Sequence, residues 1–161
     1  MKLKRTLLLL ALCCTVFAIG CKKGEQGPAG NANVEIHNFG SQTITTGVIN
    51  YTLKNISRGK IDSSLILVYY NPSIEAETSW YPIPSIGSGN LYQTRYFLTQ
   101  SGNDYSLGIR ILKMDGVTAY TTSITFTKLK VVIAPASSIH SSSINKGDYN
   151  AVKQYLQLTD N

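Results

Sequence analysis

The sequence predicts a mainly β protein: a single antiparallel β-sandwich of about seven strands with a short C-terminal helix. Short apolar runs separated by Gly, Asn, Pro and Ser follow one another from residue 34 onward, which is typical of strands joined by turns. No amphipathic segment of helical length occurs before the C-terminus. The ten tyrosines agree with this class, because aromatic side chains favour strands.

Three segments are expected along the chain. Residues 1–20 form a lipoprotein signal peptide, residues 21–33 a lipidated cysteine with a Gly-rich tether, and residues 34–161 the sandwich domain with its helix. Without the terminal segments about 130 residues remain, which is enough to bury one core of ordinary size. We therefore expect a single domain.

The first 20 residues have the three-part layout of a secretory signal. Positive charge comes first, then an apolar run over residues 7–19, then the small Gly20. The run has about 13 residues, fewer than the roughly 20 that a helix needs to cross a bilayer. We therefore expect export and cleavage rather than a membrane-spanning anchor. The positive residues are Lys2, Lys4 and Arg5.

The residues at the cleavage point indicate the type of signal. The stretch AIGC at 18–21 resembles the bacterial lipobox, in which a small residue precedes a cysteine that receives a diacylglyceryl thioether. Ala18 stands where that motif usually has leucine. The alternative is an ordinary secretory signal, which would leave Cys21 as an unpaired thiol. With two or three acyl chains on Cys21, attachment to the membrane would be stable.

Cysteine usage favours the anchor. Cys13 and Cys14 lie inside the apolar run and leave with it, so the mature chain keeps Cys21 alone. One cysteine allows neither an internal disulfide nor a structural zinc site built from four cysteines or from two cysteines and two histidines. We expect no metal and no cofactor.

The stretch GEQGPAGNA at 24–32 contains three Gly-X-Y triplets. Such triplets build the collagen triple helix, but three are too few to hold one alone. We interpret them as an extended spacer that holds the domain about 35 Å from the bilayer surface. The alternative is association of chains through the triplets; with a spacer, we expect a monomer.

Further motifs continue along the mature chain after these triplets. They are NANV at 31–34, WYPIPS at 80–85, KLKVVIAP at 128–135 and DYNAVKQYLQL at 148–158. Together with Cys21 and the collagen-like triplets, they resemble a group of Bacteroidetes-type lipoproteins that carry a β-rich domain of unknown function. The resemblance covers most of the mature chain, and it implies location and architecture rather than an activity.

Candidate strands lie at 34–39, 43–53, 63–71, 91–99, 105–114, 117–126 and 129–134. The segment SSLILVYY at 63–70 is apolar on both faces, so it should lie centrally in a sheet. The segment YSLGIRIL at 105–112 alternates in the manner of a strand with one buried face.

Local signals also predict how some of these elements begin and end. The Asp-Gly pair at 115–116 can adopt the positive φ values of a type I′ hairpin turn. The apolar alternation changes phase near residues 127–128, which predicts a β-bulge or a break there. Apolar residues at helical spacing in 149–158 predict a short helix, with Asp148 placed to cap its first turn.

The charge of the chain argues against nucleic-acid binding. The formal net charge is +6, but without Lys2, Lys4 and Arg5 there remain 12 Lys and Arg against 9 Asp and Glu. A net charge of about +3, scattered along the chain, is too little for a surface that tracks phosphates.

Groups capable of catalysis are sparse. His37 and His140 have no second metal ligand at the spacing that zinc sites use. Glu75 and Glu77 stand two residues apart and are the minimum for a carboxylate pair or a cation site. No phosphate-binding loop or dinucleotide motif is present.

Trp80 and Tyr81 are the candidate binding residues. They belong to a loop that is stiffened by prolines, and their rings have both apolar and polar character. Two interpretations stay open: Trp80 is displayed on the surface, or it packs in the core.

These observations favour a lipid-anchored protein of the bacterial cell envelope, held on the outer membrane at its periplasmic face or at the cell surface. We expect a non-catalytic binding module whose partner is an envelope protein or a glycan. Two alternatives remain: an envelope hydrolase that uses Glu75, Glu77 and His140, and a structural or assembly protein.

The lipid anchor gives the first prediction. Replacing Cys21 by Ala should leave the precursor uncleaved by the lipoprotein peptidase and without an acyl chain. Growth with a labelled fatty acid, followed by precipitation of the protein, measures this directly. A Cys21→Ala protein that still carries the label would contradict the prediction; Cys14→Ala is the matched control and should be labelled normally.

Overall fold

The computed structural model describes residues 33–139 and 144–159. The predicted signal peptide, Cys21, nearly all of the tether and His140 lie outside these described residues.

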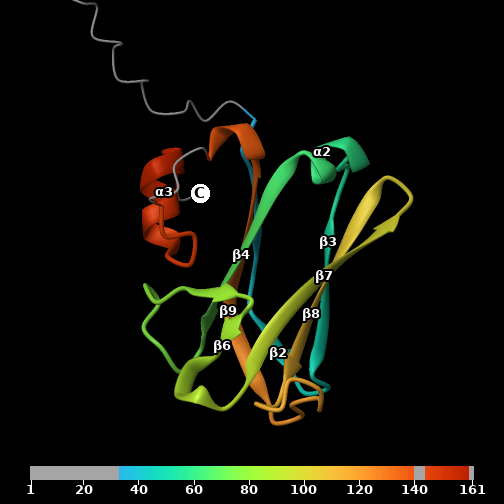
Figure 1. The fold of residues 1–161 in the computed structure, drawn as a ribbon. Coiled ribbons are helices and arrows are strands. Elements are labelled where there is room, and N and C mark those ends of the chain that lie inside the picture. The colour runs from blue at the N-terminus through green and yellow to red at the C-terminus, as the bar shows by residue number, and fades with distance from the viewer. Residues whose placement is uncertain (1–32, 140–143, 160–161) are drawn as a thin grey trace, which may run out of the picture.

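Two antiparallel sheets pack face to face, which confirms the predicted β-sandwich (Figure 1). The first sheet has the order β1 (Glu35–Phe39), β9 (Ile124–Pro135), β4 (Ser64–Pro72) and β5 (Tyr81–Ile83), and β2 (Gln42–Ile44) also pairs with β9. The second sheet has the order β3 (Val48–Leu53), β8 (Asp104–Leu112), β7 (Gln93–Ser101) and β6 (Ser85–Ile86).

The main core lies between the sheets, and the alternation of β8 shows how it forms. Every second side chain of this strand points inward and is buried, as the sequence predicted. The residues of the first sheet that face β8 belong to β4 and β9, where inward and outward side chains alternate in the same way. The inward residues of β8 are Tyr105, Leu107, Ile109 and Ile111, and they meet Val68, Tyr70, Val131 and Ile133 in one cluster.

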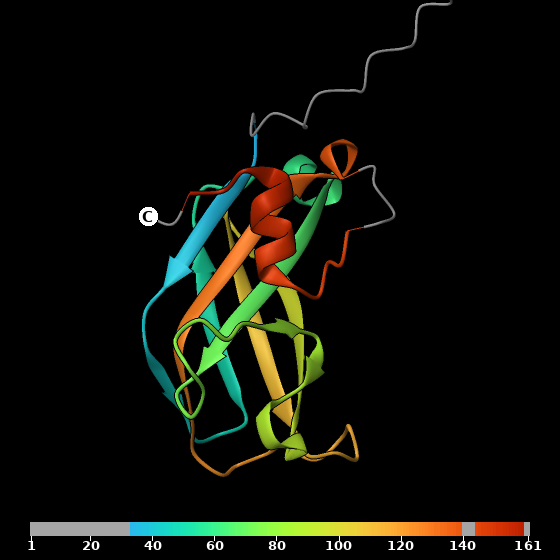
Figure 2. The same ribbon diagram turned by 90° about the vertical axis from the view of Figure 1, so that its left-hand side faces the viewer.

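A second apolar cluster lies on the other face of the first sheet, beneath helix α3 (Tyr149–Leu156). Figure 2 shows this helix lying across the outer face of the sheet. Tyr69 and Val132 point toward the helix, while their neighbours in sequence point into the sandwich. This explains why β4 is apolar on both faces, and its position between β9 and β5 confirms that it is an inner strand. The helix contributes Tyr149, Val152 and Leu156 to the cluster.

Two local predictions are confirmed by the backbone. The register of β4 against β9 passes from Asn71 opposite Lys128 to Pro72 opposite Phe126, so Thr127 is the extra residue of a bulge. Helix α3 is capped by Asp148, whose Oδ1 accepts a hydrogen bond from the backbone N–H of Asn150 at 2.9 Å.

The segment predicted as one strand at 43–53 is instead two strands in different sheets. β2 pairs with β9 in the first sheet, whereas β3 pairs with β8 in the second. The chain changes sheet at Gly47, which has a φ of +73°, a conformation that glycine adopts at little cost. The apolar residues of this segment do not show which strand each half pairs with.

The prediction of a strand at 117–126 is wrong for its first seven residues. The chain crosses here from β8 in one sheet to β9 in the other, and Val117 is 83% exposed. The predicted type I′ turn is wrong as well, because Gly116 has a positive φ and Asp115 does not. Asp115 instead accepts hydrogen bonds from the backbone N–H groups of Val117 and Thr118, at 2.8 Å each.

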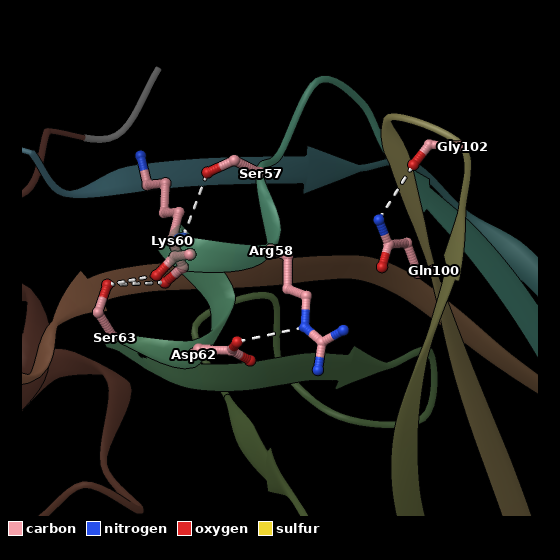
Figure 3. A network of polar contacts seen from close by, with 8 residues as sticks. Ser57, Arg58, Lys60, Asp62, Ser63, Gln100 and Gly102 are labelled. Carbon is pink, nitrogen blue, oxygen red and sulfur yellow. Dashed lines mark hydrogen bonds and ion pairs between the residues drawn. The ribbon is translucent and has the colours of Figure 1, made fainter.

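Several short elements escaped the sequence prediction, and α2 (Arg58–Asp62) is the best defined of them (Figure 3). Ser57 caps this helix by accepting a hydrogen bond from the backbone N–H of Lys60, and Arg58 pairs with Asp62 on the exposed side. The other missed elements are β5, β6 and the 3₁₀ turns η1 (Ser88–Asn90) and η2 (Ala136–Ser138). Neither helix of the described residues is long and apolar enough to cross a membrane.

The cap of α3 allows a direct test of how this helix contributes to stability. Asp148→Ala removes the acceptor for the first-turn N–H groups and should lower the free energy of unfolding by about 1 kcal/mol. Urea denaturation followed by circular dichroism measures the difference. Asp148→Asn keeps a capping oxygen and is the matched control. An Ala variant as stable as wild type would show that α3 does not unfold together with the sandwich.

Candidate functional site: a cleft beside helix α3

A cleft of about 680 Å³ opens on the outer face of the first sheet, between the start of α3 and the 73–80 loop. Figure 2 shows this loop below the first turn of the helix. The floor of the cleft comes from the end of β1 and from residues 128–130 of β9. Its walls carry Trp80 and Glu77 from the loop and Tyr149, Asn150 and Lys153 from the helix.

Lys130 lies where the sheet meets the first residue of the helix, beside the cleft. The alternation of β9 points it toward the helix, and only 6% of it is exposed. Its Nζ donates a hydrogen bond to Oη of Tyr149 at 2.6 Å. The same atom lies 5.3 Å from the centre of the Trp80 ring and 4.5 Å from that of Tyr149. A buried ammonium group needs such compensation, because losing its hydration is costly.

Trp80 is half-buried, which lies between the two interpretations that the sequence left open. Its ring packs beside Tyr149 with the ring centres 5.0 Å apart, so it belongs to the cluster beneath the helix. It also lines the cleft. One side of the ring therefore contributes to packing while another borders the cleft.

Tyr81 points to the other side of the first sheet. It packs against the core between the sheets, with its ring centre 5.7 Å from that of Tyr70, and its hydroxyl donates a hydrogen bond to Glu75 at 3.1 Å. Trp80 and Tyr81 thus do not form one continuous surface, as neighbours in an extended chain seldom do. The proposed binding role rests on Trp80.

The 73–80 loop that carries Trp80 is held by a buried amide. Nδ2 of Asn71 donates hydrogen bonds to the backbone carbonyls of Ala76 and Ser79, both at 2.8 Å. Asn71 is 1% exposed, at the end of β4. Sequence reasoning missed this residue, although a polar side chain at the end of an otherwise apolar strand is a signal for such a role.

A second polar contact fixes the start of the helix. The hydroxyl of Tyr69 donates a hydrogen bond to the carbonyl oxygen of Lys146 at 2.6 Å, just before the helix cap. Burial, assisted by the nearby charge of Asp148, raises the pKa of Tyr69 above its usual value. Tyr69 therefore keeps its proton and its hydrogen bond throughout the physiological pH range.

The cleft carries more positive than negative charge. Lys128, Lys130 and Lys153 line it, against Glu77 alone. Glu77 pairs with Lys128 at 3.3 Å on the exposed rim, where such a pair contributes little to stability. Glu75 does not join this site, because it accepts hydrogen bonds from Tyr81 and Ser88 elsewhere.

The structure separates the remaining candidate groups. His37 lies on β1 with its Nε2 at 3.6 Å from Glu35, and the pKa of Glu35 is lowered mainly by its contact with Lys60. Within residues 33–139 and 144–159, no three His, Cys, Asp or Glu side chains gather in a way that could hold a metal ion.

Comparisons of the chain with protein-family models, with curated proteins and with solved structures found no match. The resemblance to Bacteroidetes-type lipoproteins therefore stays a prediction.

The position of Trp80 predicts an intermediate effect on stability. Trp80→Ala should lower the free energy of unfolding by about 2 kcal/mol, less than the roughly 3–5 kcal/mol for a fully buried ring and more than for an exposed one. Denaturation curves of Trp80→Ala and of Trp80→Phe, which keeps an aromatic face, measure the difference. A loss below about 0.5 kcal/mol would contradict the packing described here.

Proposed function

We propose that this chain is a lipid-anchored protein of the bacterial cell envelope that holds a partner, an envelope protein or a glycan, without transforming it. The cleft beside α3 is the binding site, and Trp80 is its main contact. The predicted signal peptide and the AIGC motif support the location.

The observation that carries the proposal is the composition of the cleft. Its volume lies within the range of roughly 300–1,000 Å³ that is usual for ligand sites. A half-buried ring at Trp80 offers apolar contact, while Asn38 and Asn150 offer amide groups for hydrogen bonds. Apolar surface next to a few oriented polar groups is the usual makeup of a binding site.

The rigidity of the site also suits binding. Asn71 fixes the loop that carries Trp80, and Lys130 fixes this ring against Tyr149. Side chains that are already ordered lose little conformational entropy when a partner binds.

The arrangement of the acidic residues favours binding over the hydrolase alternative. Glu75 and Glu77 point to different partners and do not face one another across the cleft. An acid–base pair needs two carboxyl groups on either side of one bond. Glu35 on β1 is engaged with Lys60 and is not among the lining residues of the cleft.

A pull-down from detergent-solubilised envelope tests the proposed function. The lipidated protein should capture a stoichiometric partner. Asn150→Trp should reduce this capture at least tenfold, because residue 150 lines the cleft and the larger side chain would occupy it. The control is Arg58→Trp, which adds the same bulk on α2, away from the cleft, and should capture normally.

Two results would contradict the proposal. Equal capture by Asn150→Trp and wild type would remove the cleft as the binding site. Turnover of an envelope polymer by the protein, lost in Glu77→Gln, would favour the hydrolase.

A further inference from the structure

The outer face of the second sheet lies on the opposite side of the sandwich from helix α3 (Figure 1). Alternate residues of β3, β8 and β7 point to this face, and most of them are small and polar. Two arginines and one phenylalanine stand out among them. The outward residues around the arginines are Val48, Asn50 and Thr52 on β3, Ser106, Gly108 and Arg110 on β8, and Arg95, Phe97 and Thr99 on β7, and the same alternation places Asp104 at the start of β8 on this face.

Arg95 and Arg110 stand directly opposite one another in the antiparallel register of β7 and β8. Like charges in this position destabilise a sheet, since opposite side chains start only about 4.5–5.5 Å apart at Cβ. No carboxylate of the described residues forms an ion pair with either guanidinium; the four ion pairs found there involve other side chains. Both arginines are exposed.

The two guanidinium groups lean away from one another. Arg110 extends over the ring of Phe97, with Cζ at 5.2 Å from the ring centre. Arg95 extends the other way along the strands, so that a Cβ placed on Gly116 would lie only 3.0 Å from its Nη2. This separation lowers the repulsion between the two like charges.

Phe97 forms a flat apolar platform beside these charges. Its ring lies on Gly108, the residue opposite, so closely that a Cβ there would come within 2.1 Å of the ring. The ring is still 38% exposed. Glycine at position 108 therefore lets the ring lie flat on the sheet rather than stand away from it.

We propose that this face binds an anionic polysaccharide. Acidic groups of the polymer pair with Arg95 and Arg110, because guanidinium groups bind carboxylates and sulfates through paired N–H donors. A sugar ring lies on the face of Phe97, and the neighbouring Asn50 and Thr99 offer hydrogen bonds to hydroxyl groups. The acidic side chain on these strands, Asp104, lies at the start of β8, six residues before Arg110, and its Oδ1 accepts a hydrogen bond from the backbone N–H of Asn55 at 2.9 Å. The open sheet around the two arginines therefore suits an extended, negatively charged chain.

The composition of the face favours a polysaccharide over a single-stranded nucleic acid. Nucleic acids are held by a row of cations along the backbone and by several stacking rings. This face offers two cations and one exposed ring. Sparse charge and many small hydroxyl and amide groups instead match a polymer rich in hydroxyl groups.

Affinity electrophoresis of the full-length protein in non-ionic detergent tests the proposal. Polygalacturonate or dextran sulfate in the gel should retard the protein, and neutral dextran should not. The Arg95→Gln and Arg110→Gln changes together should weaken binding at least tenfold, and Phe97→Leu should weaken it several-fold because it keeps the cover over Gly108 but loses the flat ring. Arg58→Gln, which removes the same charge from α2, is the matched control and should bind normally.

Stability measurements separate a binding role of the arginines from a structural one. Arg95→Gln removes the like-charge contact, so its thermal midpoint should equal or exceed that of wild type. A marked fall in the midpoint would overturn the proposal, as would unchanged retardation of the double arginine variant. Tighter binding to a single-stranded oligothymidylate than to both acidic polysaccharides would also overturn it.

The same assays distinguish the cleft beside α3 from the outer face of the second sheet. Asn150→Trp should leave retardation by the acidic polysaccharide unchanged, because it lies on the opposite side of the sandwich. Loss of retardation in Asn150→Trp would place the acidic polymer in the cleft and overturn the assignment to the sheet face.

Discussion

The first sheet is apolar on both faces, and the rest of the structure depends on covering both. One face is covered by the second sheet, as in any sandwich. The other is covered by α3, whose buried residues meet Tyr69 and Val132. An eight-residue helix is marginal in water alone, so its stability comes from this contact. In turn, the outer face of β4 and β9 stays out of water because the helix docks there.

The cleft follows from the way this helix is placed. α3 covers the sheet only from Tyr149 onward, and the uncovered part beside it is bordered by the 73–80 loop. Lys130 lies at this boundary, where a lysine can reach both a hydroxyl group and two aromatic rings. The polar side chain inside an otherwise apolar contact fixes the position of the helix more narrowly than apolar packing would.

Properties set by neighbouring residues were predictable from the sequence, and those set by partner strands were not. The alternation of β8, the bulge at Thr127 and the cap at Asp148 each depend on a few adjacent residues. The change of sheet at Gly47 depends on which distant strand each half meets. The half-burial of Trp80 likewise depends on contact with a helix far along the chain. The facing arginines become visible only once the register of β7 and β8 is known.

Docking of α3 on the outer face of the first sheet is the central claim, and Trp80 reports on it as the single tryptophan of the chain. Acrylamide quenching of its fluorescence should be compared in wild type and in Val152→Asp, which places a charge in the buried contact. With the sandwich still folded by far-ultraviolet circular dichroism, the variant should show a red-shifted emission and a quenching constant at least twice that of wild type. Identical emission and quenching in the two folded proteins would contradict the account.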